Sequence, residues 1–387
     1  MQEHWGTRRE TLVRISIQAC CANIAEDLKF WASAEVWEIW LLPVMSYRYL
    51  GNKTKLTSWI CATLAAKSTA VARIADPMCG TGAVAEAFAR SGYTVVASDV
   101  LKFPTLHAKA RLQFDRLYDF TIVGHPGYRS AINELNGLSP IEGFFWREYS
   151  ADGVPENGVD PRRYFTGDNA GKIDAMRQKI ADWRAKGLSE GAADLLLHDL
   201  ILATNRVANI TGTYGYFRST WNRECLQPIQ LVQSSMIPCK ADHAVFNGRA
   251  EDLIHEINTC DACYLDPPYT KRQYGGNYHI LETIAQEDMP VPAGQGGLRD
   301  WKEKASDFCY RKKAPAAFQS LLKLIDVPLV FISYSNDGQV SPEELKDILG
   351  QFGAVSRKTV PFTRFDSNGR GGDKQQLEEH LYILDRR

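Results

Sequence analysis

Short apolar runs alternate with helix-like segments along the chain. Residues 70–75 are almost wholly apolar, which is typical of a buried parallel strand. A segment of helical periodicity follows, with Val84 and Phe88 on one face, and residues 94–97 form the next apolar run. This pattern predicts a strand–helix–strand unit of a parallel sheet.

The same alternation returns in the second half of the chain. Residues 262–265 and 327–333 predict two further buried strands, and residues 342–349 predict a helix after the second of them. Residues 355–361 and 380–384 predict a terminal antiparallel pair of strands around a Gly-rich loop. Strands that alternate with helices indicate an open α/β sheet.

A long segment separates the two halves of this predicted sheet. No connection between a strand and a helix needs the length of residues 101–240, so we expect an inserted domain there. Its pattern is mainly helical, because Ile173, Met176 and Ile180 recur at helical spacing and Ser189 could cap a following helix.

Three predicted domains follow from these patterns. Residues 1–44 are rich in Trp and Ala and predict a helical extension, because the pattern changes character at Met45. Residues 45–100 and 241–387 predict the sheet domain, which the helical domain of residues 101–240 interrupts.

Composition narrows the class of protein. The 387 residues are 44% hydrophobic and 24% charged, which is ordinary for a globular protein with a full core. The net charge is −1, so any surface for nucleic acid has to be a local basic patch. The N-terminus lacks a signal-peptide pattern, and the apolar stretch 30–44 contains two Glu and is too short to cross a bilayer. We expect a cytoplasmic protein without a membrane partner.

The cysteines predict neither a disulfide framework nor a metal site. The chain has 9 Cys, an odd number scattered over a long sequence. Cys260 and Cys263 form a lone Cys-x-x-Cys, and neither a second pair nor a His pair follows at the spacing of a zinc site.

The first predicted strand runs into a glycine-rich turn. Residues 76–82 read Asp-Pro-Met-Cys-Gly-Thr-Gly and open a helix, where glycines let backbone N–H groups approach a ligand. Asp99, at the end of the next strand, is placed to accept hydrogen bonds from ribose hydroxyls. Together they indicate an adenosine-containing ligand; the alternative is a structural turn and a helix-capping Asp.

A later strand ends in a more specific motif, Asp266-Pro267-Pro268-Tyr269. Two prolines make an extended turn and remove two N–H donors, which leaves carbonyl oxygens beside Asp266 as acceptors. Such a group can accept both hydrogens of an amino nitrogen, and Tyr269 offers a flat face for stacking. A base flipped out of a duplex presents both an amino group and a ring.

These motifs and their order resemble the DNA adenine methylase family of S-adenosylmethionine-dependent enzymes. A segment reading Tyr-Leu-Gly-Asn-Lys-Thr-Lys-Leu, residues 49–56, precedes the glycine-rich turn, and the long insertion lies between the turn and Asp-Pro-Pro-Tyr. The resemblance covers most of the chain, residues 45–385. It implies a Rossmann-like class I methyltransferase sheet, an inserted domain that reads the target sequence, and methyl transfer to the N6 amino group of adenine after base flipping.

The resemblance also implies roles for individual residues. Asp266, Pro267, Pro268 and Tyr269 would form the catalytic motif. The cofactor-binding residues would be Tyr49, Lys53, Asp76, Cys79, Gly80, Gly82, Asp99 and Asp266. Near the base, the family often places a residue at the positions of Asn277, Tyr278 and His279. Relatives often carry an acidic residue where Arg249 stands, and Glu251 or Asp252 could substitute for it.

Other segments suit contacts with DNA. Residues 142–150, 163–166 and 212–217 mix aromatic with basic side chains, and Tyr214 is a candidate among them; the alternative is that these aromatics form the core of the insertion. The loop between the terminal strands carries Arg370 and Lys374, which we expect to contact DNA.

Several alternatives remain open at this level. They are a catalytically inactive DNA-binding protein on the same scaffold, methylation of the 4-amino group of cytosine, methylation of RNA adenine, and a small-molecule or protein substrate. The partners we expect are double-stranded DNA and a cognate restriction enzyme or defence proteins, with the methylase itself a monomer.

Overall fold

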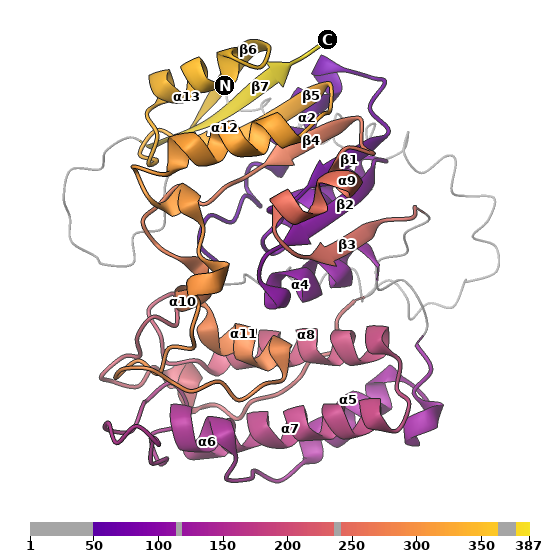
Figure 1. Cartoon of the computed structure of the whole chain (residues 1–387). Helices are drawn as coiled ribbons and strands as arrows, with labels where there is room; N and C mark the ends of the chain where they lie inside the picture. Colours follow the sequence, from indigo (N-terminus) through magenta and orange to yellow (C-terminus); the bar gives the residue numbers. More distant parts are fainter. Residues whose placement is uncertain (1–48, 114–117, 236–240, 363–376) are drawn as a thin grey trace, which may run out of the picture. The chain divides into compact units, whose positions relative to one another are not determined.

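The computed structural model describes residues 49–113, 118–235, 241–362 and 377–387, all within one compact unit (Figure 1). The predicted extension of residues 1–44 and the loop with Arg370 and Lys374 lie outside the described residues.

A single sheet of seven strands carries the cavity described below, in the order β3-β2-β1-β4-β5-β7-β6. The neighbours from β3 to β5 pair in parallel, whereas β7 pairs antiparallel with both β5 and β6. The strands are β1 (Arg73–Asp76), β2 (Thr94–Asp99), β3 (Ala244–Asn247), β4 (Ala262–Leu265), β5 (Leu329–Ser335), β6 (Ala354–Phe362) and β7 (Leu377–Asp385). The predicted open sheet with a terminal antiparallel pair is confirmed. The sequence pattern missed β3, because this edge strand is only partly buried.

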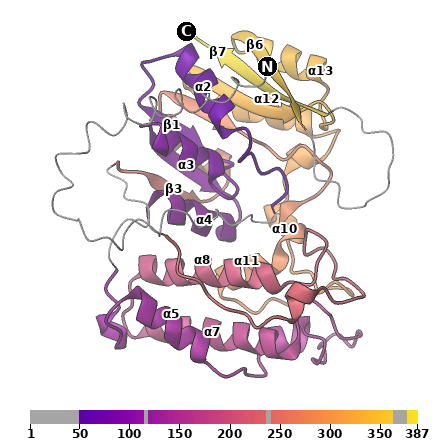
Figure 2. The ribbon, with the colours of Figure 1, turned by 180° about the vertical axis from the view of Figure 1, so that it is seen from behind.

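Helices cover both faces of the sheet, as Figures 1 and 2 show from opposite sides. Alternate residues of each strand point to opposite faces. Ile74 and Tyr264 share a core with α2 (Thr57–Lys67) and α3 (Ala83–Arg90). Cys263 and Leu265 share the other core with α12 (Ala314–Leu324) and α13 (Pro342–Gly350).

A further layer of helices lies beside the sheet (Figure 1). It contains α5 (Tyr128–Gly137), α6 (Phe144–Tyr149), α7 (Gly167–Ala185), α8 (Glu190–Val207) and α11 (His279–Gln286). The mainly helical pattern and the cap of α8 are confirmed: the Ser189 hydroxyl accepts from the Ala192 N–H at 3.3 Å. Short elements complete the chain: α4 (Lys102–Leu112), α9 (Ile254–Ile257), α10 (Tyr274–Asn277), and the 3-10 helices η3 (Thr121–Val123), η4 (Arg223–Leu226), η5 (Ala250–Leu253), η6 (Lys302–Lys304) and η7 (Asp307–Cys309).

Packing in this helical layer crosses the predicted domain boundaries. Helix α4 contacts β2 and β3 of the sheet, yet its Phe103 and Leu106 belong to the hydrophobic core of the helical layer. Helix α11, which follows the Asp-Pro-Pro-Tyr motif in sequence, also packs on α4 and α8. The helical layer therefore draws on residues from both sides of the predicted boundary at residue 240.

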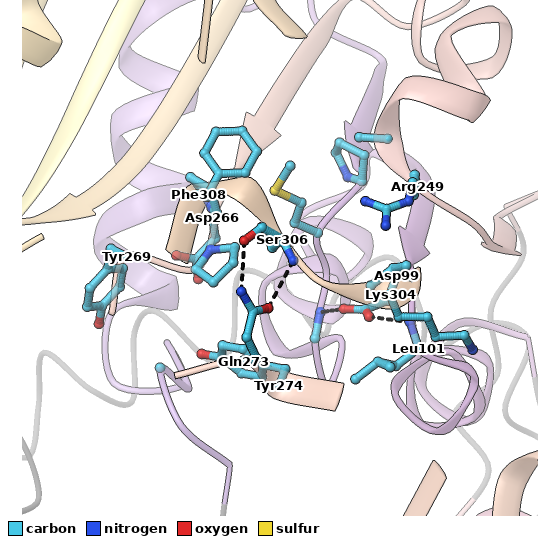
Figure 3. A pocket seen from close by; sticks show the side chains of 18 of the residues that line it. Asp99, Leu101, Arg249, Asp266, Tyr269, Gln273, Tyr274, Lys304, Ser306 and Phe308 are labelled. Atoms are coloured by element: carbon cyan, nitrogen blue, oxygen red, sulfur yellow. Dashed lines mark hydrogen bonds between the residues drawn. The ribbon is translucent and has the colours of Figure 1, made fainter. Parts of the chain in front are cut away.

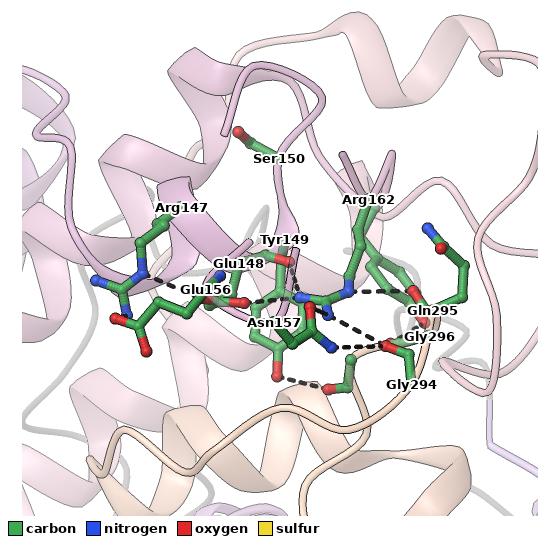
Figure 4. A network of polar contacts seen from close by, with 12 residues as sticks. Arg147, Glu148, Tyr149, Ser150, Glu156, Asn157, Arg162, Gly294, Gln295 and Gly296 are labelled. Atoms are coloured by element: carbon green, nitrogen blue, oxygen red, sulfur yellow. Dashed lines mark hydrogen bonds and ion pairs between the residues drawn. The ribbon is translucent and has the colours of Figure 1, made fainter. Parts of the chain in front are cut away.

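A buried ion pair in the helical layer binds the loop around residues 294–296 (Figure 4). Arg162 and Glu148 are both 0% exposed, and the Arg162 Nη1 lies 2.7 Å from the Glu148 Oε2. The same guanidinium donates to the carbonyls of Gln295 at 3.1 Å and Gly294 at 3.2 Å, and to the Asn157 side chain at 2.8 Å. Because a buried charge is stable only when its donors and acceptors are satisfied, this network holds the loop around residue 295 in place.

The glycine-rich turn requires glycine at its last position for a packing reason. Gly82 has φ +75°, and a Cβ there would lie 2.9 Å from the Ala108 Cα of α4. Gly82 therefore lets α3 and α4 approach closely.

We predict that Gly82→Ala destabilises the protein more than Gly92→Ala. Gly92 has φ +92°, and a Cβ added there would meet no atom within 4 Å. Both variants therefore carry the strain of a positive φ, about 1–3 kcal/mol. Only Gly82→Ala adds a steric clash, which costs about 1–3 kcal/mol more. Urea denaturation of the two variants measures the difference. Equal losses would show that the contact with α4 has no energetic weight.

Candidate functional site

A cavity of about 1070 Å³ opens at the carboxyl ends of β1, β2 and β4 (Figure 3). In an open parallel sheet this is where ligands bind, at the point where the strand order reverses. Most of the residues expected to form the cofactor site or the catalytic motif line it: Tyr49, Lys53, Asp76, Cys79, Gly80, Asp99, Asp266, Pro267, Pro268 and Tyr269. Gly82 is not among the lining residues.

The glycine-rich turn is hydrogen-bonded to the end of β2. The Cys79 N–H donates to the Ser98 carbonyl at 2.9 Å, and the Gly80 N–H donates to the Asp99 carboxylate at 3.1 Å. Gly80 has φ +50°, and a Cβ there would lie 2.9 Å from the ring of Tyr49. The turn therefore leaves room in the cavity only because no side chain stands at this position.

Three of the carboxylates that line this cavity lie at or just after the ends of strands, and burial raises the pKa of each of these three. The pKa of Asp76 lies well above its ordinary value, because burial and the charges of Asp266 and Asp99 outweigh the nearby amides of Met78 and Ala85. Burial raises the pKa of Asp99 to about 7 and that of Asp266 to about 6. Both Asp76 oxygens are buried without a hydrogen bond of good geometry to the described residues. Such a site favours a ligand that brings positive charge and hydrogen-bond donors.

The Asp-Pro-Pro-Tyr motif meets Lys53 inside the cavity. The Lys53 Nζ lies 3.2 Å from the Asp266 Oδ1 and 4.9 Å from the centre of the Tyr269 ring. Tyr269 also contacts Tyr334 edge-on, with ring centres 5.8 Å apart. Lys53, expected to contact the cofactor, thus lies against the Asp-Pro-Pro-Tyr motif.

The residues expected to bind the base do not line the cavity. Tyr214, Tyr278 and His279 are fully buried in the helical layer, and Asn277 is also absent from the cavity lining. The Tyr278 hydroxyl accepts from the Leu50 N–H at 2.8 Å, and a ring nitrogen of His279 lies 2.9 Å from the Tyr214 carbonyl. In this structure these contacts are structural. A contact of Asn277, Tyr278 or His279 with a base, and of Tyr214 with DNA, stays a prediction.

Most aromatics of the segments expected to contact DNA are also core residues. Phe144, Phe145, Tyr149, Tyr164 and Phe165 are all buried in the helical layer. Their number reflects the size of this core, which was the alternative interpretation of these segments.

Sequence reasoning missed one wall of the cavity, the loop of residues 301–308. The Gln273 side chain donates to the Ser306 carbonyl at 3.0 Å and accepts from the Ser306 N–H at 2.9 Å (Figure 3). Arg249 donates to the Ala305 carbonyl at 3.2 Å and so helps to hold this loop. Of the two acidic residues that could substitute for Arg249 near the base, Glu251 lines the cavity and Asp252 does not. No periodic pattern marks such a loop, since long-range hydrogen bonds position it.

A buried carboxylate, that of Glu282 in α11, links this wall to the end of the cavity where Asp99 lies. It accepts hydrogen bonds from the backbone N–H groups of Lys102 at 3.1 Å and Phe103 at 3.0 Å, which begin α4 shortly after Asp99. It also accepts from the Lys304 Nζ at 2.7 Å. The start of α4 and the loop are therefore held by one side chain.

The described residues contain neither a cluster of metal ligands nor a helix that could cross a membrane. No group of three or more His, Cys, Asp or Glu side chains there is arranged to hold a metal ion. None of the helices that the structure describes is long and apolar enough to span a bilayer.

The comparisons with known proteins agree with this geometry. The model of the D12 class N6 adenine-specific DNA methyltransferase family matches residues 49–336. The chain is 30% identical over 344 residues to the modification methylase StsI of Streptococcus sanguinis, covering 87% of this chain and 51% of that protein. It is 29% identical over 345 residues to the Type II methyltransferase M.NlaIII of Neisseria lactamica, and this match covers 87% of this chain and 99% of M.NlaIII. The chain thus spans about half the length of StsI and nearly all of M.NlaIII.

We predict that Gln273→Ala loosens the loop of residues 301–308. The variant loses both hydrogen bonds to Ser306, so the Ser306 amide should exchange its hydrogen up to about 10-fold faster. Hydrogen exchange followed by mass spectrometry measures this. Gln351→Ala, which removes a contact at the end of α13, is the control; an unchanged rate in Gln273→Ala would contradict the role of this pair.

Proposed function

Because the chain belongs to the D12 class N6 adenine-specific DNA methyltransferase family, we propose that it transfers the methyl group of S-adenosylmethionine to the N6 amino group of adenine in double-stranded DNA. The observation that carries the proposal is the position of Asp266, Pro267 and Tyr269 in the same cavity as Asp76 and Asp99.

The cavity residues fit S-adenosylmethionine. The half-buried Asp99 would hold the ribose, and the glycine-rich turn with Asp76 would hold the methionine part, whose ammonium suits a buried carboxylate. The loop of residues 301–308 would cover the adenine side. When bound, this cofactor supplies a methyl group on a positively charged sulfur, which a nitrogen lone pair can attack directly.

The motif residues would prepare the target amine. Asp266 and the Pro267 carbonyl would accept its two hydrogens, which directs the nitrogen lone pair out of the plane of the base and stabilises developing positive charge. One face of the Tyr269 ring has the Lys53 ammonium over it, so an adenine flipped out of the duplex would stack on the other face.

The test is Asp266→Asn, which keeps the size of the side chain and removes its charge. Loss of the preorganised negative charge beside the target amine should lower methyl transfer by about 10²-fold or more. The assay uses labelled S-adenosylmethionine and unmethylated genomic DNA, and Asp252→Asn, outside the cavity lining, is the control.

Two outcomes would contradict the proposal. Wild-type turnover in folded Asp266→Asn would reject the catalytic role of this residue. Nucleoside analysis that finds N4-methylcytosine and no N6-methyladenine in the product would reject adenine as the target.

Target recognition and partners belong to the same proposal. The helical layer would read the DNA sequence. Because relatives are named Type II methyltransferases and modification methylases, a restriction enzyme of the same specificity would be the functional partner.

The rim of the cavity suits DNA phosphates. Besides Lys53, five basic side chains line the cavity: Arg249, Lys302, Lys304, Lys312 and Lys313. Lys304 pairs with Glu282 and Lys313 with Asp307. Lys302 and Lys312 are exposed, and their ammonium groups make no ion pair with the described residues. In a chain of net charge −1, such a local patch would supply the attraction for DNA.

We predict that Lys302→Ala with Lys312→Ala weakens DNA binding and its dependence on salt. Each lost phosphate contact lowers the slope of log Kobs against log salt by about 0.9, so the double variant should lose up to about 2. Fluorescence anisotropy over a salt series measures the slope. The control double variant is Lys323→Ala with Lys346→Ala, two exposed lysines of α12 and α13; equal slopes in both would remove the rim from the DNA-binding surface.

A further inference from the structure

A second buried acidic side chain reaches the catalytic motif from the far end of the chain. Glu379 lies in β7, beyond the residues 49–336 that match the family, and is fully buried. Its Oε1 lies 3.1 Å from the Lys53 Nζ and accepts from the Ser333 hydroxyl of β5 at 2.7 Å. Its other carboxylate oxygen is buried without a hydrogen bond to the described residues.

Lys53 therefore bridges two carboxylates. Its ammonium lies 3.2 Å from Asp266 and 3.1 Å from Glu379, with the Tyr269 ring at 4.9 Å. Burial alone would lower the pKa of Lys53, but Asp266, Tyr269 and Glu379 raise it, so the ammonium stays charged. The ammonium is held from both sides, and if it turned away, the buried Glu379 carboxylate would lose its positively charged neighbour and keep only the Ser333 hydroxyl.

Resting on the function proposed above, we propose that Glu379 is a positioning residue for methyl transfer: through Ser333 and Lys53 it fixes the charged group that holds Asp266 and Tyr269 in place. Glu379 does not line the cavity and so does not touch the reacting atoms itself. Because β7 pairs with β5, which lies next to β4, Glu379 is brought beside the Asp-Pro-Pro-Tyr motif that follows β4.

The arrangement has a consequence for pH. Only the ionised form of Asp266 can accept both the Lys53 ammonium and a target amine, so the rate should fall as the pH drops through the Asp266 pKa of about 6. The charged and titratable groups that face Glu379 are Lys53, Asp266 and the Tyr264 hydroxyl. Burial raises the pKa of Asp266, Lys53 lowers it, and the negative charge of Glu379 raises it further.

Glu379→Gln tests the proposal, because the amide can still accept from Ser333 and Lys53 but carries no charge. The Asp266 pKa should then fall, and the acid limb of the rate profile should move to lower pH by about 0.5–2 units. The measurement is the single-turnover rate of methyl transfer from pH 5 to 8, with saturating S-adenosylmethionine and unmethylated genomic DNA.

The matched control is Glu378→Gln, which makes the same change one residue earlier, where the carboxylate is 46% exposed and pairs with His380. We expect its profile to match that of the wild type. If the pH profile of Glu379→Gln coincides with those of the wild type and of Glu378→Gln, the positioning role is overturned. The proposed function would still stand in that case, provided that the wild type transfers methyl groups and Asp266→Asn does not.

A second variant covers the case in which Glu379→Gln does not fold. Glu379→Asp keeps the charge but draws the carboxylate back from Lys53 by one methylene, so the single-turnover rate should fall several-fold, and Glu378→Asp should not change it. A wild-type rate in folded Glu379→Asp would equally overturn the positioning role.

Discussion

The ammonium of Lys53 is the charge on which the catalytic end of the cavity depends. A parallel sheet aligns the carboxyl ends of its strands, so Asp76, Asp99 and Asp266 come together, and β7 adds Glu379 beside them. Carboxylates brought together away from water repel one another and raise one another's pKa. Lys53 lies between Asp266 and Glu379 at hydrogen-bonding distance and offsets part of this cost.

The remaining negative charge suits the chemistry of the family. Asp76 has no hydrogen-bond partner of good geometry among the described residues, and its pKa is raised by its acidic neighbours. A cofactor that carries an ammonium and a sulfonium would relieve this repulsion, so a feature that costs stability in the free protein favours binding. The site is destabilised where the ligand supplies the missing charge.

The cavity also depends on a segment that forms no strand or long helix. The loop of residues 301–308 is held by Gln273, by Arg249 and, through Lys304, by Glu282. Glu282 belongs to α11 in the helical layer and at the same time binds the first amides of α4, next to Asp99. The helical layer and the sheet therefore shape one cavity together, which explains why packing does not follow the boundaries expected from sequence.

The sequence by itself determined the strands that carry the site and the chemistry at their ends. The strands β1, β2, β4 and β5 are short apolar runs, and Asp76, Asp99 and Asp266 occur at or just after the ends of three of them. Apolar periodicity and turn residues act over a few neighbouring positions, so one sequence suffices to read them. In the tertiary structure, Tyr164 can be buried because its hydroxyl has a carbonyl acceptor within reach, that of Tyr214 at 2.8 Å or that of Gly296 at 2.9 Å. Glu379 in β7 reaches Lys53, which lies near the start of the described chain. Such pairings arise between segments far apart in sequence, and no local pattern records them.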